Sequence, residues 1–198
     1  MQLLSTPVAF FVFNRPDETF LVFDMIRQAK PQKLFIIVDA PRSENPTDLE
    51  RCQKVLEIVK QVDWDCEVLY EIATSNLGCR DRVSSGIDWV FSHVESAIIL
   101  EDDCLPDISF FQFCQVLLDY YWDDLNILGI TGSNILKSCD FEESYTFSRY
   151  PLVWGWATWK RSWKEYDVNM KKWSTINQQE WLYSIFHNNK TEIGRAHV

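Results

Sequence analysis

The chain has 198 residues, of which 46% are hydrophobic and 24% are charged, and its formal net charge is -10. This composition is typical of a globular protein of one domain's size, which excludes an intrinsically disordered chain. The negative charge disfavours nucleic acid as a partner, because affinity for a phosphate backbone comes largely from Lys and Arg.

The first apolar run, Val8 to Phe13, is far shorter than the roughly 20 residues that span a bilayer, so it predicts a buried strand and no transmembrane segment. After it, helices and strands alternate. The predicted elements are a helix beginning at Asp17 with Phe20, Phe23 and Ile26 on one face, a strand over Lys33 to Val38, a helix capped by Asn45, a strand over Cys66 to Tyr70, a helix carrying Val83 to Val94, a strand over Ala97 to Leu100, a helix over Phe110 to Trp122 and a strand over Ile127 to Ile130. This order predicts an α/β fold with right-handed βαβ units and a mainly parallel sheet covered by helices on both faces.

Three consecutive carboxylates, Glu101, Asp102 and Asp103, directly follow the predicted strand over Ala97 to Leu100. Mn²⁺ and Mg²⁺ prefer oxygen ligands, and a nucleotide diphosphate supplies several, so a protein need contribute only one or two carboxylates. Because successive side chains of an extended segment point to opposite sides, Glu101 and Asp103 are expected on one face and Asp102 on the other. The triplet therefore predicts a metal and sugar site, and the alternative is a solvated strand end.

Other polar residues are expected beside this triplet, because ligands of open α/β sheets sit at the carboxyl ends of the strands. Asn14 and Arg15 follow the first strand, and Asp39 ends the second. The alternative to a ligand contact is that Arg15, which precedes a proline, is a surface turn residue. For Asp39 the alternative is that it caps the following loop. Arg80 lies at the start of a helix, where a basic residue does not complement the helix dipole, so either a nearby phosphate or plain solvation explains it.

Four stretches of the chain resemble the donor-binding half of GT-A (Rossmann-like) glycosyltransferases, and in particular bacterial glycosyltransferase-like proteins related to N-acetylglucosaminyltransferase I. The stretches are Val8 to Pro16, Leu34 to Asp39, Asn76 to Gly78 and Ile98 to Phe111. In that family an Asn-Arg pair follows the first strand, an Asp ends the second and Glu-Asp-Asp ends the fourth. The resemblance implies that Arg15 contacts the diphosphate or nucleotide, Asp39 the uracil or ribose, Asp102 the sugar or ribose, Asp103 the metal and Glu101 the donor sugar.

The pattern after Gly132 changes to aromatic-rich, irregular sequence with helical stretches near Arg161 and Gln178. Trp154, Gly155 and Trp156 resemble the family's segment along the acceptor side. Indole faces suit sugar rings and a glycine lets a ligand approach the backbone, but we expect only one of the two tryptophans to touch a ligand.

We divide the chain into a donor-binding half (1–132), the start of an acceptor-side half (133–192) and a tail (193–198). One reading frame of a common sequencing-adapter oligonucleotide encodes that tail, so we interpret it as an artefact that follows a truncation near Thr191.

The sequence thus predicts a metal-dependent glycosyltransferase that transfers a sugar, with inversion, from a nucleotide-diphosphate sugar to a glycan or other hydroxyl acceptor. A UDP-sugar is the favoured donor, and the metal is Mn²⁺ or Mg²⁺. In the resembling family the catalytic base is an aspartate in a later tryptophan-rich segment, and no equivalent precedes the truncation, so this chain is expected to bind donor without turning it over.

Two alternatives stay open. One is a sugar-nucleotide nucleotidyltransferase, which is expected to carry a glycine-rich loop after its first strand, whereas Asn14-Arg15-Pro16 has no glycine. The other is a non-catalytic carbohydrate or protein interaction module. We expect a cytoplasmic protein, with peripheral association at the inner membrane as the alternative for a lipid-linked acceptor.

Overall fold

The computed structural model describes residues 4–133 and 144–173, and it divides the chain into two compact units, Met1–Lys164 and Glu165–Val198. The fold described below is that of the first unit. In the second unit the described residues form a turn, in which the Asp167 carboxylate accepts hydrogen bonds from the backbone N–H groups of Asn169 (3.1 Å) and Lys171 (2.6 Å). The predicted helical stretch near Gln178 and the tail 193–198 lie outside the described residues.

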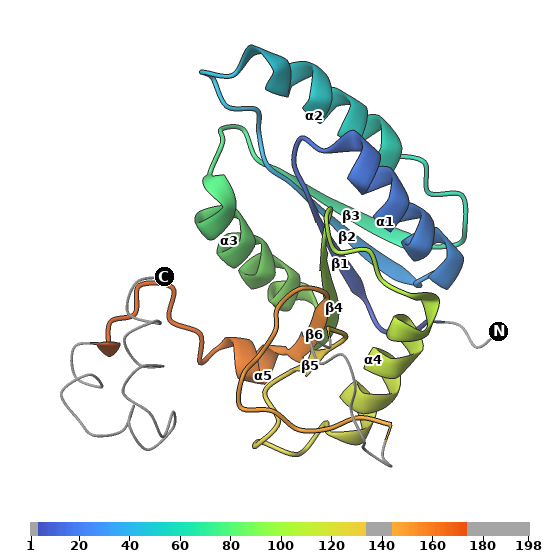
Figure 1. Ribbon diagram of the computed structural model, residues 1–198, viewed down its shortest axis with the longest axis vertical. Helices are drawn as coiled ribbons and strands as arrows, with labels where there is room; N and C mark the ends of the chain where they lie inside the picture. Colours follow the sequence, from blue (N-terminus) through green and yellow to red (C-terminus); the bar gives the residue numbers. More distant parts are fainter. Residues whose placement is uncertain (1–3, 134–143, 174–198) are drawn as a thin grey trace. The chain divides into compact units, whose positions relative to one another are not determined.

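The first unit contains a six-stranded sheet in the order β3-β2-β1-β4-β6-β5 (Figure 1). The elements are β1 (Val8–Val12), α1 (Pro16–Ala29), β2 (Lys33–Val38), α2 (Pro46–Val59), β3 (Glu67–Ile72), α3 (Gly78–His93), β4 (Ser96–Glu101), α4 (Ile108–Tyr120), β5 (Ile130–Thr131), β6 (Trp156–Trp159) and α5 (Lys160–Trp163). Strands β1 to β4 are parallel, and β6 runs antiparallel to both β4 and β5. The predicted Rossmann-like α/β fold with a mainly parallel sheet is confirmed.

The sheet is covered on both faces, and its central strands β1, β2 and β4 are apolar except at the first residue of β2 and at the two ends of β4. In β1, Val8, Phe10 and Val12 pack into the cluster that contains the core residues of α1, α2 and α4, whereas Ala9 and Phe11 pack into the cluster that contains those of α3. All five residues of β1 are buried. Alternating side chains of one strand thus supply both cores, which is why the sequence is a continuous hydrophobic run.

Helix α3 lies so close to the sheet that Gly86 has no room for a side chain. A Cβ atom there would lie 2.5 Å from Cε1 of Phe11 and 2.9 Å from Cγ2 of Ile37. We predict that Gly86→Ala lowers the free energy of unfolding by about 1 to 2 kcal/mol in chemical denaturation, because the clash outweighs alanine's better helix propensity. Ser84→Ala in the same helix is the matched control, and a Gly86→Ala protein as stable as the wild type would contradict this packing.

Two details of the predicted helices and strands were wrong. Phe20 is 51% exposed, because the buried face of α1 is formed by Thr19, Val22, Phe23, Ile26 and Ala29. The strand expected over Ile127 to Ile130 is reduced to β5. The residues before β5 form a turn instead. The Arg161 guanidinium donates hydrogen bonds of 3.0 to 3.1 Å to the carbonyl groups of Tyr121, Asp124 and Ile127 in this turn.

Strand β6 lies in a segment that the sequence pattern presented as irregular. It enters the sheet between β4 and β5, with Ile99 opposite Trp156 and Ile98 opposite Ala157. The indole of Trp159 is buried and donates to the Leu118 carbonyl at 3.2 Å. Residues beyond 133 therefore complete the same sheet, while the functional division into a donor-side and an acceptor-side half stays a prediction.

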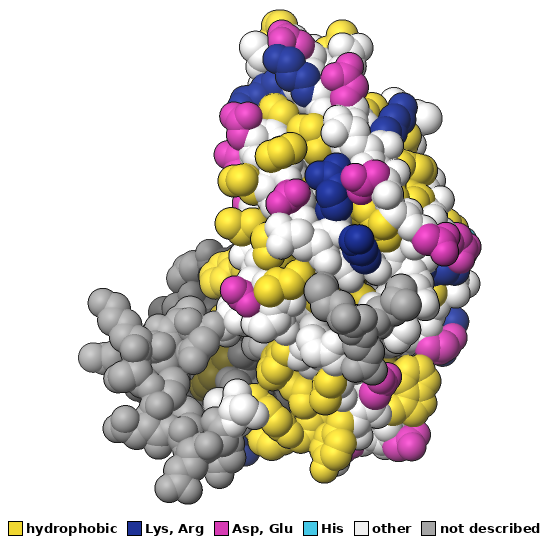
Figure 2. Space-filling view, turned by 90° about the vertical axis from the view of Figure 1, so that its right-hand side faces the viewer, with side chains coloured by type: hydrophobic (Ala, Val, Ile, Leu, Met, Phe, Trp, Pro, Cys, Tyr) yellow, Lys and Arg dark blue, Asp and Glu magenta, His cyan; other side chains and the backbone are white. Residues whose placement is uncertain are grey.

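The face that Figure 2 shows carries charges of both signs over its upper part and groups of hydrophobic side chains lower down. Among residues 4–133 and 144–173, no helix is long and apolar enough to cross a membrane. A groove of about 530 Å³ lies between α1 and α2, and Phe20, Leu21 and Ile58 are among its lining residues. Its lining includes none of the predicted site residues.

Candidate functional site

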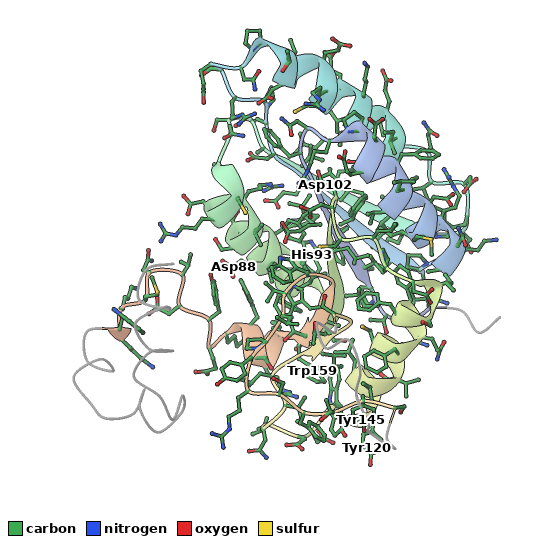
Figure 3. All side chains as sticks on the ribbon, in the orientation of Figure 1. Asp88, His93, Asp102, Tyr120, Tyr145 and Trp159 are labelled. Carbon is green, nitrogen blue, oxygen red and sulfur yellow. The ribbon has the colours of Figure 1, made fainter. Side chains whose placement is uncertain are left out.

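The predicted site residues gather at the carboxyl ends of β1, β2 and β4. Strand β1 pairs with β2 on one side and with β4 on the other, so the chain order reverses at the β1–β4 boundary. In open α/β sheets ligands bind at such a switch point, beyond the carboxyl ends of the strands. Figure 3 shows Asp102 at this end of the sheet, far from Trp159.

Arg15 binds two carboxylates of the acidic triplet at once. Its Nη2 lies 2.5 Å from Oδ1 of Asp102, and its Nη1 lies 2.8 Å from Oδ2 of Asp103. The Asp102 side chain is only 3% exposed and also accepts the Phe13 N–H at 3.3 Å, whereas the Asp103 side chain is 48% exposed. The inner pair is therefore a structural link between β1 and β4, and the outer pair faces solvent.

The expected alternation of the triplet fails for Asp102 and Asp103, whereas Glu101 and Asp103 both lie near the Cys79 thiol. Strand β4 ends at Glu101, and the N–H of Cys104 binds the Glu101 carbonyl at 3.0 Å, which closes a turn. Because of that turn, Asp102 and Asp103 converge on one guanidinium instead of pointing to opposite sides. Within the residues that the structure describes, the half-buried Glu101 carboxylate forms no hydrogen bond or ion pair.

The three carboxylates differ in their electrostatic environments. Burial, and then the nearby charges of Asp103 and Asp102, raise the pKa of Glu101. Burial also raises the pKa of Asp102 and outweighs the opposing effect of Arg15. Burial lowers the pKa of Arg15, but its contacts with Asp102 and Asp103 outweigh this, so the net shift is upward and Arg15 keeps its charge. The site is thus a cluster of negative charge compensated by one cation.

The start of α3 lies against the same cluster. Burial raises the pKa of the Cys79 thiol, the nearby charges of Glu101 and Asp103 raise it further, and the charge of Arg15 opposes them. Arg80 follows, with a side chain that is 63% exposed and 3.9 Å from Asp81. The structure therefore places Arg80 one residue from a thiol that faces the triplet.

Asp39 holds this helix start in place. Its Oδ1 accepts the N–H groups of Ala40 and Leu77, both at 2.9 Å. Its Oδ2 accepts the Gly78 N–H at 3.0 Å and the Asn76 side-chain amide at 3.1 Å. Gly78 has a φ of +75°, which favours glycine, and the buried Asp39 thus caps the loop that leads into α3.

Asn14 belongs to a second cluster, formed around the buried Asp48, that sequence reasoning missed. Its Nδ2 donates to Oδ1 of Asp48 at 2.7 Å, and Asp48 also binds Arg42. Asp48 lies in the first turn of α2, capped by Asn45, so its sequence position indicates only a favourable charge at a helix start. No local pattern could have predicted a contact between residues 34 positions apart.

The predicted acceptor-side residues reach the same edge of the sheet. Burial raises the pKa of the Cys104 thiol, next to Asp103, to about 11, against an opposing effect of the nearby Gly155 backbone, and Gly155 precedes Trp156, which pairs with Ile99 of β4. Gly155 has a φ of +70°. Trp154 is 63% exposed, whereas Trp156 is half-buried and packs against Trp163, with ring centroids 6.5 Å apart and ring planes tilted by 51°. Of the two tryptophans, Trp154 is the one that presents its indole to solvent.

The carboxylates suit a divalent cation only if a ligand brings further oxygens. Among the described residues, no three Asp, Glu, His or Cys side chains form a set that could hold a metal. Asp103 is accessible, its Oδ2 is bound to Arg15, and its Oδ1 has only the long 3.7 Å contact from the Cys104 thiol. One or two carboxylates completed by diphosphate oxygens are the usual ligands of a nucleotide-bound Mg²⁺, and these residues fit that arrangement.

No protein-family model matches this chain. No curated protein matches it either. Among solved structures, 4-diphosphocytidyl-2C-methyl-D-erythritol synthase from Anaerococcus prevotii DSM 20548 is similar to it, with a TM-score of 0.41 and 10% sequence identity over 94% of this chain and 84% of that chain. The fold assignment therefore depends on the strand order and pairing described above.

Proposed function

We propose that this chain binds a nucleotide-diphosphate sugar, with UDP-sugar as the favoured donor, and belongs to a metal-dependent glycosyltransferase of the GT-A type. The observation that carries the proposal is the pairing of Arg15 with Asp102 and Asp103 at the switch point between β1 and β4. A cation beside the exposed Asp103 carboxylate suits a diphosphate and its metal, because each charge of the ligand finds an opposite charge at the site.

Each residue has a role in this proposal. Asp103 would hold the divalent metal. Arg15 would bind the diphosphate, and Asp102 would keep the Arg15 side chain in place. Arg80 would add a second positive charge on the α3 side. Glu101, which has a raised pKa, would bind a hydroxyl group of the donor sugar, and Trp154 beside Gly155 would line the acceptor side. The metal, when bound, supplies Lewis-acid stabilisation of charge on the leaving diphosphate.

Calorimetric titration with UDP in the presence and absence of Mn²⁺ tests this proposal. We predict that UDP binds in a metal-dependent manner and that Asp103→Ala removes the metal-dependent part, with an affinity loss of roughly tenfold or more, because a charged ligand contact is lost. Asp119→Ala, an exposed carboxylate on α4, is the control. If the wild type shows no UDP binding with any divalent metal, the proposal is wrong and a non-catalytic interaction module is favoured.

A sugar-nucleotide nucleotidyltransferase is the second candidate, since it would use the same end of such a sheet. It differs in its ligand, because a nucleotidyltransferase binds a nucleoside triphosphate and releases pyrophosphate. The loop after β1 contains Asn14, Arg15 and Pro16 and no glycine among them. It therefore offers fewer backbone N–H groups to a triphosphate than a glycine-rich loop would. Titration with UTP and CTP beside UDP separates the two, since preference for a triphosphate favours the second candidate.

A further inference from the structure

The hydrogen bonds of Asp39 leave its carboxylate without capacity for a ligand. A carboxylate has about four acceptor positions, and Asp39 fills them with the N–H groups of Ala40, Leu77 and Gly78 and the amide of Asn76. A nucleobase that donates to Asp39 would have to displace one of these bonds and release the start of α3. If a nucleotide binds here, another side chain at this edge must contact its base.

Arg42 lies at this edge of the sheet, and its guanidinium has N–H donors available for a ligand. Its Nε and Nη2 bind the two oxygens of Asp48 at 2.6 and 3.0 Å, and its side chain is 41% exposed. Within the described part of the chain, its Nη1 forms no hydrogen bond. Asp48 therefore fixes the guanidinium, and the N–H groups of Nη1 are available to a ligand.

Two contacts connect Arg42 to the proposed phosphate end. Its guanidinium lies 5.5 Å from the ring centroid of Phe13, whose backbone N–H holds Asp102. The buried Cys52 thiol, with a pKa raised to about 11 by burial and by Asp48 and Asp39, lies near Arg42 as well. Arg42 is thus next to Asp39, one strand away from Arg15 in the sheet order.

Building on the function proposed above, we infer that Arg42 binds the nucleobase of the donor and that Asp48 is the residue that positions Arg42. The free Nη1 edge matches the carbonyl oxygens of a pyrimidine, and the exposed face of the guanidinium can stack on the ring. Asp48 is suited to its role because its side chain is only 1% exposed and grips the Arg42 backbone N–H (3.2 Å) as well as the guanidinium.

The test compares two ligands that share phosphates but not a base. Wild type and variants are titrated with UDP and with pyrophosphate, each in the presence of Mn²⁺. Arg42→Ala should weaken UDP roughly tenfold and change pyrophosphate less than about twofold, because only the base contact is lost. Arg15→Ala should weaken both ligands, and Arg51→Ala, an exposed arginine on α2, should weaken neither. Thermal unfolding of each variant verifies that it is folded, and Arg42→Lys replaces Arg42→Ala if the latter is not.

The positioning role has its own measurement. If Asp48 acts through Arg42, Asp48→Asn weakens UDP, and adding Arg42→Ala to it costs little more affinity. Additive losses would refute that role. Equal loss of UDP and pyrophosphate in Arg42→Ala, or no loss of either, would overturn the nucleobase assignment while leaving the proposed function intact. A wild-type chain that binds neither ligand with metal would instead refute the proposed function.

Discussion

Replacing Arg15 with methionine is expected to lower the free energy of unfolding by about 2 kcal/mol at pH 7. Removing one partner of a buried ion pair leaves the other charge without compensation, which typically costs 3 to 5 kcal/mol when both groups are buried, so ~2 kcal/mol allows for the 41% exposure of Arg15. The loss falls on Asp102, which among the residues that the structure describes would keep only the Phe13 N–H as a partner, at 3.3 Å.

The pH dependence identifies Asp102 as the cause. Its pKa in the folded protein is raised already with Arg15 present, and removal of the cation raises it further. In the pH window between the unfolded and folded pKa values the folded state binds more protons, so its stability increases as pH falls. The deficit of Arg15→Met should therefore shrink as the solution is acidified through the folded pKa of Asp102.

Chemical denaturation at several pH values measures this effect, with Arg51→Met as the control for losing an exposed arginine. Asp103→Asn is a second comparison, since the Asp103 side chain is 48% exposed and its pair with Arg15 should contribute little to stability. A deficit in Arg15→Met that stays constant with pH would mean that the lost contact is packing of the arginine stem and not its charge on Asp102.

Most of the parallel part of the fold could be predicted because β1, β2 and β4 are short apolar runs whose residues are largely buried. Those runs at β1, β2 and β4 are unambiguous in the sequence, and their polar ends place Arg15, Asp39 and Asp102 at one edge. Strand β6 could not be predicted, because its residues pair with β4 residues that lie 57 to 63 positions earlier, and its four residues have no local pattern that distinguishes a strand from an aromatic loop.

The positions of the candidate site residues were predictable, but their contacts were not. The triplet and Arg15 follow from the strand ends, whereas the turn at Glu101 to Cys104 that brings both aspartates to one guanidinium depends on a single backbone hydrogen bond. Asp48 and Arg42 were missed because helix-start aspartates and loop arginines are common on any surface. Only the fold shows that Asp48 is buried beneath two loops of the site.

Asp39→Ala is expected to lower the free energy of unfolding by about 3 kcal/mol, because it leaves the N–H groups of Ala40, Leu77 and Gly78 without their acceptor. The damage should be local to the start of α3. Hydrogen exchange of the Leu77 and Gly78 amides should accelerate more than that of amides in the middle of the helix.

The control is Asp81→Ala, an exposed aspartate in the first turn of the same helix, which should change both measurements little. UDP titration of Asp39→Ala then distinguishes the loop anchor seen in the structure from the direct nucleotide contact that the family resemblance implies. An anchor loses stability and amide protection together, with any loss of UDP affinity following from the displaced helix start. If the variant kept its stability and its slow amide exchange but lost its affinity for UDP, the Asp39 carboxylate would be a ligand contact. Asp39, and not Arg42, would then bind the nucleobase.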